Sequence, residues 1–249
     1  MCSTPPIINR SIFADHANAC GTDKASIHGY QRFYPLVLAQ LSAPEPFTIV
    51  EIGFGTGASI PLWKELFPQS YLICIDRDVS QQGDGFVVIQ ADQEQPEQLQ
   101  MALHDPPSPV RLVIDDGSHL PRHQLSSFSM IFEEILEPGG FYIIEDIETS
   151  YWLAGELYGN QIRAGLFSRW SAIEALKLAA DYINRAYLSE EDRNLLEYSM
   201  LMAGLAPAAA RMINSLTFGQ NCVLISKNEP GDSDYQEKPY PYAPFTARY

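Results

Sequence analysis

Residues 110–152 read VRLVIDDGSHLPRHQLSSFSMIFEEILEPGGFYIIEDIETSYW, and this stretch decides the fold. It holds two apolar runs, Val110–Ile114 and Phe141–Ile144, separated by a segment with the length of a crossover helix. Such a unit predicts two parallel strands. Each run is followed by two carboxylates: Asp115 and Asp116, then Glu145 and Asp146. Parallel neighbours end at the same edge of a sheet, where open α/β sheets bind ligands, so these four side chains and His119 should converge there.

The composition is that of one large globular α/β domain. The chain has 249 residues, of which 46% are hydrophobic, enough for a proper core. A formal charge of −15 argues against nucleic acid or an anionic membrane as the main partner, because both attract basic patches. We therefore expect neither as a partner and leave a homo-oligomer open.

The sequence favours a cytoplasmic protein. No apolar run approaches the ~20 residues that span a bilayer, and the N-terminal MCSTPPIINRS lacks a signal-peptide pattern. The four cysteines have no paired spacing, which argues against a disulfide framework or a thiolate zinc site. The expected setting is a reducing compartment.

Strands and helices alternate before the opening stretch. Strands are predicted at Phe47–Ile52, Tyr71–Ile75 and Phe86–Gln90, and helices at Ser59–Phe67 and Glu94–His104. Five strands alternating with helices indicate a doubly wound α/β sheet. Further upstream, residues 1 to about 10 are expected to form a loose arm. The aromatic and aliphatic spacing of Gly29–Leu41 predicts a helix that covers the domain.

The pattern changes after Trp152. Gly155–Leu205 contains no convincing strand, and two helices are predicted, at Ile173–Tyr187 and Arg193–Leu205, the second starting near Ser189. Such an insertion is a natural place for a substrate pocket. Ser215–Phe218 and Cys222–Ser226 then predict a closing β-hairpin, and the tail Asn228–Tyr249 is expected to be an extended strap or disordered.

A glycine loop follows the first strand and indicates an adenosine-type ligand. The loop reads Glu51-Ile-Gly53-Phe-Gly55-Thr-Gly57, and glycines there let the backbone approach a ligand closely. Asp76 and Asp92 end the next two strands, where carboxylates can accept hydrogen bonds from ribose hydroxyls or face the adenine.

The same residues allow a second interpretation. Gly53-x-Gly55-x-x-Ala58 is a loose dinucleotide fingerprint, which would suit an NAD(P)-dependent oxidoreductase. However, Glu51 stands two residues before the first glycine, and a carboxylate there would repel a pyrophosphate and attract a cationic ligand.

The carboxylates of the opening stretch predict a metal site. Asp116, Glu145 and Asp146 would repel one another in a cleft, and Mg²⁺ would relieve that repulsion. His119, three residues after Asp116, could take a proton from a metal-bound hydroxyl. The alternative is an ordinary turn and helix cap at Asp-Asp-Gly-Ser. His123 is interpreted either as a solvated residue or as a residue that contacts the site residues without contacting the ligand.

These motifs resemble known families. The glycine loop with Glu51 resembles the first motif of class I S-adenosylmethionine-dependent methyltransferases, whose sheet has seven strands and ends in a hairpin. Residues 18–227 resemble the macrolide-sugar O-methyltransferases and the similar rhamnosyl and cephalosporin-hydroxylase-like groups. The motifs that carry this resemblance are Asp115-Asp116-Gly-Ser-His119, Pro-Gly-Gly before Glu145-Asp146, Thr149-Ser150-Tyr151-Trp152, Gly21-Thr22-Asp23-Lys24 and His28-Gly29-Tyr30.

The resemblance implies a function and a set of site residues. It implies Mg²⁺-dependent transfer of a methyl group from S-adenosylmethionine to a sugar or other aliphatic hydroxyl of a polyketide-type antibiotic or related natural product. His119 would be the base, and Asp116, Glu145 and Asp146 the metal ligands. Cofactor-binding residues would be Glu51, Gly53, Gly55, Gly57, Asp76, Asp92, Asp115, Thr22, Lys24 and Tyr30, and substrate-binding residues would be His28, Tyr151 and Trp152.

The expected fold is a single Rossmann-like methyltransferase domain with a seven-stranded sheet, a C-terminal hairpin and a helical insertion after strand five. Its parts are an arm and covering helix (1–45), a cofactor and metal half (46–152), a substrate insert (153–210), a closing hairpin (211–227) and a tail (228–249). The macrolide-sugar enzymes carry a further N-terminal domain that these residues do not match, so the acceptor and the oligomeric state stay open. Besides the oxidoreductase, a non-catalytic partner that binds S-adenosylmethionine is an alternative.

Overall fold

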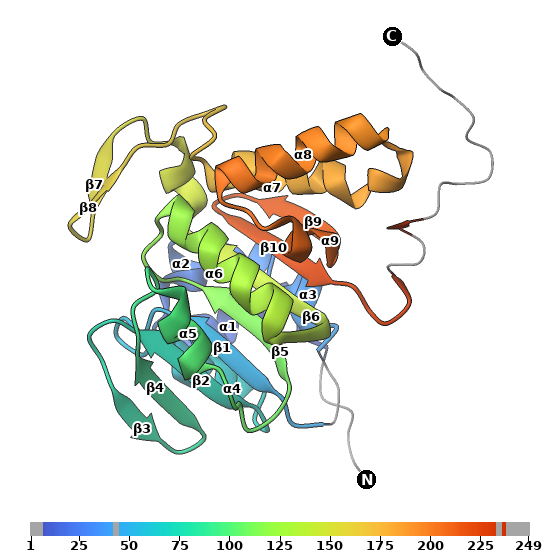
Figure 1. The fold of residues 1–249 in the computed structure, drawn as a ribbon. Coiled ribbons are helices and arrows are strands. Elements are labelled where there is room, and N and C mark those ends of the chain that lie inside the picture. Colours follow the sequence, from blue (N-terminus) through green and yellow to red (C-terminus); the bar gives the residue numbers. More distant parts are fainter. Residues whose placement is uncertain (1–6, 42–44, 233–235, 238–249) are drawn as a thin grey trace.

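The computed structural model describes residues 7–41, 45–232 and 236–237, and its centre is an eight-stranded sheet (Figure 1). The strand order is β3-β4-β2-β1-β5-β6-β10-β9. Five strands are parallel: β1 (Thr48–Ile52), β2 (Tyr71–Asp76), β4 (Phe86–Gln90), β5 (Val110–Asp115) and β6 (Leu136–Glu145). Three antiparallel strands complete it: β3 (Gln81–Gly83), β9 (Ile213–Gly219) and β10 (Cys222–Lys227).

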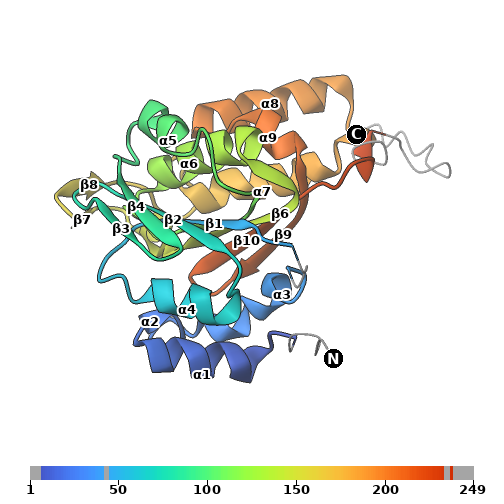
Figure 2. The ribbon, with the colours of Figure 1, turned by 90° about the horizontal axis from the view of Figure 1, so that it is seen from below.

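Helices cover both faces of the sheet, as Figure 2 shows. One face carries α1 (Arg10–Cys20), α2 (Asp23–Ser26), α3 (Pro35–Leu38) and α4 (Ser59–Leu66). The other carries α5 (Pro96–Ala102), α6 (Pro121–Glu134), α7 (Ala172–Ile183), α8 (Glu190–Ala203) and α9 (Pro207–Arg211). Short 3₁₀ turns are η1 (Tyr30–Arg32), η2 (Ile147–Tyr151) and η3 (Arg185–Tyr187). No helix in the described ranges is long and apolar enough to cross a bilayer.

The parallel strands are apolar on both faces because each face is covered. In β6, Tyr142 and Ile144 belong to the core under α6 and α7, whereas Phe141 and Ile143 belong to the core under α1 and α4. Successive side chains of a strand point to opposite faces, so one continuous apolar run supplies both cores. The predicted doubly wound fold with a closing antiparallel hairpin is therefore confirmed, with eight strands rather than seven.

The eighth strand lies in a segment for which the sequence predicted no strand. Gln81–Gly83 forms β3, which pairs antiparallel with β4 at the edge of the sheet. These three residues are polar or glycine, and edge pairing alone makes them a strand. No hydrophobic pattern marks such a strand in the sequence.

The predicted covering helix over Gly29–Leu41 is wrong. This segment forms only η1 and α3, while the longer helix is α1, immediately upstream. Gly29 adopts a left-handed φ of 67°, and Pro35 has no backbone N–H to continue the preceding turn. The side chain of Asn9 accepts hydrogen bonds from the first turn of α1 and so fixes its start. Residues 1–6 of the expected loose arm lie outside the described residues.

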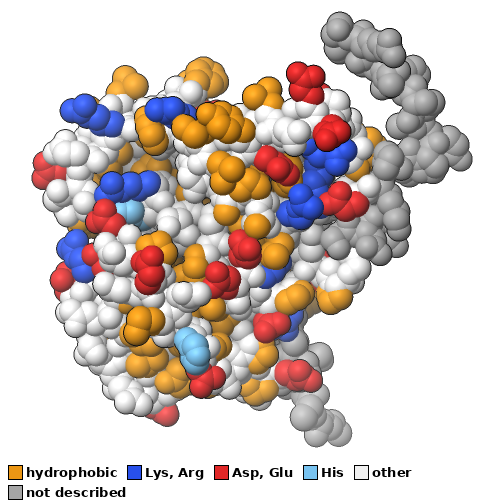
Figure 3. All heavy atoms as spheres, viewed as in Figure 1, with side chains coloured by type: hydrophobic (Ala, Val, Ile, Leu, Met, Phe, Trp, Pro, Cys, Tyr) orange, Lys and Arg blue, Asp and Glu red, His pale blue; other side chains and the backbone are white. Residues whose placement is uncertain are grey.

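The insertion contains a hairpin as well as the two predicted helices. β7 (Gly155–Leu157) pairs antiparallel with β8 (Asn160–Ile162), contrary to the expectation of no strand in this region. The helix predicted to begin near Ser189 does so, with the Ser189 hydroxyl accepting from Asp192 N. Hydrophobic side chains gather on the surface over α8 and the preceding loops (Figure 3), among them Leu166, Phe167, Trp170, Leu195, Tyr198 and Leu201. Of the predicted strap, residues 238–249 lie outside the described part of the chain.

Candidate active site

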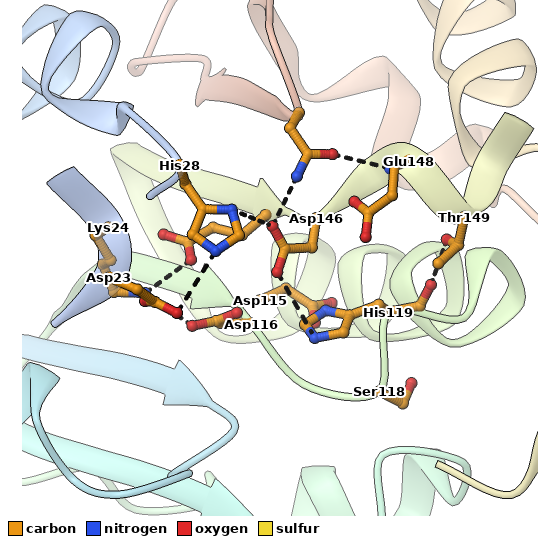
Figure 4. A network of polar contacts seen from close by, with 12 residues as sticks. Asp23, Lys24, His28, Asp115, Asp116, Ser118, His119, Asp146, Glu148 and Thr149 are labelled. Carbon is orange, nitrogen blue, oxygen red and sulfur yellow. Dashed lines mark hydrogen bonds and ion pairs between the residues drawn. The ribbon is translucent and has the colours of Figure 1, made fainter. Parts of the chain in front are cut away.

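The acidic strand ends converge as predicted. β5 and β6 run parallel with Asp115 opposite Ile144, so the residues that follow each strand meet at one edge of the sheet. Figure 4 shows Asp116 and His119, both from the loop after β5, lying close to Asp146, which follows β6. One potential ligand atom from each of these three side chains lies within 4.8 Å of the other two. The arrangement could hold a divalent cation.

Two of these residues have a strained backbone. His119 has a φ of 56° and Asp146 a φ of 49°, in the left-handed region that non-glycine residues rarely adopt. Hydrogen bonds hold both in place. Thr149 Oγ1 donates to the His119 carbonyl at 2.5 Å, and Tyr30 Oη and Asn221 Nδ2 donate to Asp146 Oδ1 at 2.6 and 2.8 Å. Strain that is fixed in this way is characteristic of functional sites.

Lys24 lies beneath the cluster and is 1% exposed. Its Nζ is 2.8 Å from Asp116 Oδ2, 2.7 Å from Glu145 Oε2 and 3.4 Å from Glu51 Oε1. Burial alone would lower the pKa of Lys24, but these three carboxylates raise it well above its ordinary value. Burial acts against Asp116, yet Lys24 holds the pKa of Asp116 below its usual range. The ammonium group therefore already neutralises part of the acidic edge.

Glu145 points into the protein, away from solvent. It is 2% exposed, and it accepts hydrogen bonds from Lys24 and from Tyr34 Oη. Burial and the neighbouring Asp116 raise the pKa of Glu145 well above its usual value. Glu51 is equally buried and accepts a hydrogen bond from Trp63 Nε1 at 3.0 Å. Both predicted site residues thus contact Lys24 directly.

A cavity of about 320 Å³ opens beside the glycine loop. Five predicted residues line it: Gly53, Gly55, Asp76, Asp92 and Asp116. Further lining residues include Gln93, Ser118, His123, Tyr158 and Asn160. We call this space the donor cavity. Since Asp116 belongs both to its wall and to the carboxylate cluster, whatever fills the donor cavity ends at that cluster.

The glycine loop has the close approach that the sequence indicated. A Cβ atom on Gly53 would lie 2.1 Å from the Asp116 carbonyl oxygen, and Gly53 has a φ of 95°. The neighbouring Phe54 N–H donates to Asp76 Oδ2 at 3.1 Å, which ties the loop to the end of β2. Gly57 also has a positive φ, but it does not line the donor cavity.

Asp115 supports the cavity from behind. It is fully buried and accepts hydrogen bonds from Gln93 Nε2 at 2.8 Å and from Tyr142 Oη at 3.2 Å. Burial raises its pKa to about 6. Gln93 Oε1 in turn accepts from the backbone N–H of Ser118 in the cavity wall. Asp115 therefore orients its neighbours and does not line the donor cavity itself.

The remaining predicted residues are His28, Thr22, Tyr151 and Trp152. His28 Nδ1 lies 3.2 Å from Asp146 Oδ1, and Thr22 caps the α2 turn that carries Lys24. His28 and Tyr151 line a second cavity, of about 470 Å³, together with Glu148 and Asn221. Trp152 is not among its lining residues; its ring lies against Gly155.

Several residues of the site were not found from the sequence. Tyr34 and Asn221 bind Glu145 and Asp146 from segments far away in the chain, and no local pattern marks them. Gln93 directly follows the predicted acid Asp92, so its place at a strand end was a usable signal. Of the two interpretations of His123, the solvated one is wrong, because His123 is 5% exposed and accepts a hydrogen bond from Arg122; its Nδ1 also lies 2.9 Å from Ser118 Oγ in the cavity wall.

The chain is similar to sugar O-methyltransferases of antibiotic pathways, although no family model matches it. It is 32% identical over 217 residues to the 8-demethyl-8-alpha-L-rhamnosyl tetracenomycin-C 2'-O-methyltransferase of Streptomyces olivaceus, covering 83% of this chain and 52% of that protein. It is 35% identical over 145 residues to the L-olivosyl-oleandolide 3-O-methyltransferase of Streptomyces antibioticus, covering 55% and 36%. The chain therefore spans about half the length, or less, of these curated relatives.

The structure is similar to the MycE methyltransferase from the mycinamycin pathway, solved in complex with Mg, SAH and mycinamycin VI. The TM-score is 0.72 at 23% identity, and the match covers 88% of this chain and 54% of that one. This likeness shows a shared fold. The resemblance to macrolide-sugar and rhamnosyl O-methyltransferases that the motifs indicated is confirmed.

Proposed function

We propose that the protein is a Mg²⁺-dependent O-methyltransferase that transfers the methyl group of S-adenosylmethionine to a hydroxyl of a glycosylated natural product. The observation that carries the proposal is the shared position of Asp116, which lines the donor cavity and also belongs to the cluster with His119 and Asp146. The named activities and acceptors of the similar proteins support the same reaction and point to a sugar hydroxyl on a polyketide-type metabolite.

The donor cavity suits a nucleoside with a positive charge. Gly53 and Gly55 provide close backbone approach, and Asp76 and Asp92 place carboxylates where ribose hydroxyls and an adenine edge would lie. Four aspartates, Asp76, Asp78, Asp92 and Asp116, line this cavity, and such a wall attracts a sulfonium and repels a pyrophosphate. A nicotinamide-dependent oxidoreductase is therefore not favoured.

Asp116 and Asp146 are the proposed Mg²⁺ ligands, together with Glu145. The resemblance to the macrolide-sugar enzymes supports Glu145, which lies close to Asp116, since Glu145 Oε2 and Asp116 Oδ2 are both within 2.8 Å of Lys24 Nζ. Carboxylate oxygens suit Mg²⁺. When bound, the metal would lower the pKa of an acceptor hydroxyl and fix its direction. His119 is the competing third ligand, because its ring also belongs to the cluster.

His119 is the proposed general base. It is 7% exposed, its Nε2 lies 3.8 Å from Asp146 Oδ2, and its buried Nδ1 has no hydrogen-bond partner within the described residues. An imidazole with a free nitrogen can take the proton of the acceptor hydroxyl. The acceptor oxygen then bonds to the methyl carbon while the carbon–sulfur bond breaks, which leaves S-adenosylhomocysteine. The second cavity, beside His28 and Tyr151, and the exposed apolar insert are the proposed acceptor side.

Calorimetry with defined ligands tests the proposal. The protein should bind S-adenosylhomocysteine and not NAD⁺, and the reverse result would establish the oxidoreductase alternative. His119→Ala should abolish methyl transfer to a glycosylated polyketide and leave S-adenosylhomocysteine binding intact. His104→Ala, at an exposed histidine, is the matched control. Full activity of His119→Ala would refute the base, and full activity in EDTA would refute the metal.

The metal ligands need a separate measurement. Glu145→Gln should weaken Mg²⁺ binding, measured by titration calorimetry, at least as strongly as Asp146→Asn does. If His119→Ala weakens Mg²⁺ binding and Glu145→Gln does not, then His119 is the third ligand. If none of the three variants shows turnover, the activity assay does not separate these cases. The Mg²⁺ affinity then decides between them. A protein that binds the donor product but methylates no glycoside would support the non-catalytic alternative.

A further inference from the structure

The β7–β8 hairpin has an unusual turn. Leu157 pairs with Asn160, so the connection has only two residues, Tyr158 and Gly159. Their φ angles are 50° and 77°, both positive, as a type I′ turn requires. Asn-Gly is the preferred sequence for such a turn, because asparagine tolerates a positive φ better than other side chains do. A tyrosine in that position strains the backbone, so turn formation does not explain why it is there.

The tyrosine belongs to the wall of the donor cavity. The hairpin projects from the body of the molecule (Figure 1), and Tyr158 and Asn160 at its tip line the donor cavity. The ring centroid of Tyr158 lies 5.9 Å from that of His119. Among the described residues that line this cavity, Tyr158 alone has a phenol, phenyl or indole ring. The ring therefore lies near His119, at the end of the cavity where methyl transfer is proposed.

We propose that the β7–β8 hairpin is a lid on the donor cavity and that Tyr158 covers the sulfonium end of S-adenosylmethionine. The proposal rests on the proposed function. The face of a phenol ring attracts a cation, and its apolar surface excludes water from the reacting methyl group. Tyr158 is 63% exposed, so much of its surface is available for such a contact. The backbone strain at Tyr158 is then the cost of placing a ring at this point.

One substitution separates this role from a structural one. Tyr158→Asn creates the preferred Asn-Gly turn, so the Tm of the ligand-free protein should stay the same or rise. The Kd of S-adenosylmethionine, measured by calorimetry, should increase about tenfold, which corresponds to about 1.4 kcal/mol. S-adenosylhomocysteine, whose sulfur carries no charge, should lose clearly less affinity. Tyr158→Phe should retain both affinities within about twofold.

Phe167→Asn is the matched control. Phe167 belongs to the same insertion, has a φ of 63° and is 81% exposed, but it does not line the donor cavity. Its replacement should relieve similar strain and change neither donor affinity. A fall in donor affinity equal to that of Tyr158→Asn would show that any aromatic of the insertion has this effect and would overturn the proposal.

The other outcomes also decide the question. Unchanged S-adenosylmethionine affinity in Tyr158→Asn overturns the lid. Equal losses for the charged and uncharged ligands overturn the sulfonium contact, and a fall in Tm together with the affinity indicates a purely structural residue. If the folded wild-type protein binds neither ligand, the proposed function fails together with the lid. If the wild type binds both and Tyr158→Asn binds equally well, the lid alone fails.

Discussion

Replacing Lys24 by methionine should destabilise the protein strongly. Methionine has nearly the volume and the unbranched shape of lysine, so Lys24→Met removes the charge and leaves the packing almost unchanged. The change leaves Asp116, Glu145 and Glu51 without the ammonium group that lies 2.7–3.4 Å from each of them. Two of these carboxylates, Glu51 and Glu145, are 2% exposed, so water cannot replace the lost partner.

The magnitude follows from burial. Breaking a buried ion pair by removing one partner costs about 3–5 kcal/mol, because the remaining charge is left uncompensated. Since Lys24 serves two carboxylates at hydrogen-bond distance, the loss should lie at the upper end of this range. For a chain of this size each kcal/mol lowers the Tm by about 2–4 °C, so a loss of about 5 kcal/mol lowers the Tm by about 10–20 °C.

Urea denaturation in EDTA measures this change, and Lys227→Met is the control. Lys227 is 8% exposed, and its Nζ donates to the Leu136 carbonyl at 2.6 Å, with no carboxylate at ion-pair distance among the described residues. Its loss should cost only about 1–2 kcal/mol. Mg²⁺ should recover part of the stability of Lys24→Met, because a cation that binds the folded state stabilises it. If Lys24→Met loses no more stability than Lys227→Met, the argument that the Lys24 ammonium group compensates several buried carboxylates is refuted.

Three further outcomes are expected. Gly53→Ala should cost about 3–5 kcal/mol in urea denaturation, since its Cβ would meet the Asp116 carbonyl oxygen at 2.1 Å, whereas Gly55→Ala, in open space, should cost about 1 kcal/mol; equal losses would contradict the close approach. Burial and Arg122 lower the pKa of His123, so its contribution to stability is present above the unfolded pKa of ~6.5 and is lost as the pH falls through the lower folded pKa. Denaturation midpoints measured between pH 8 and pH 5 should therefore fall less steeply in His123→Gln than in the wild type, and parallel curves would count against this. Ser189→Ala should lower stability by about 1 kcal/mol through loss of the α8 cap, seen as a lower Tm.

The features that the sequence predicted correctly depend on local patterns. The β5 and β6 strands are continuous apolar runs, and a strand buried on both faces needs no more than that. Their acidic ends converge because parallel strands end together, which follows from chain direction alone. Ser189 as the start of α8 is also local, since a cap is formed by residues within one turn.

The features that it missed depend on distant parts of the chain. Lys24 reaches Glu145 across 121 residues of sequence, and nothing near either residue signals that contact. β3 is a strand only because β4 offers it a free edge. The aromatic spacing of Gly29–Leu41 reflects burial against the sheet, with Tyr34 stacked on Trp63, rather than a continuous helix. Helical spacing can arise from burial alone when a segment turns repeatedly over a core.

The turn between β9 and β10 has a consequence for how the protein is made. Asn221 donates to Asp146, accepts from the Glu148 N–H at 3.0 Å through its side chain, and accepts from Tyr30 Oη at 3.0 Å through its carbonyl. Asp146, at the end of β6, is synthesised 75 residues before Asn221. During synthesis the nascent chain therefore contains β5 and β6 before it contains Asn221, whose hydrogen bonds orient Asp146. The site becomes complete only when the last hairpin closes, so premature termination between residues 146 and 221 should leave a chain with most of its sheet strands and no organised site.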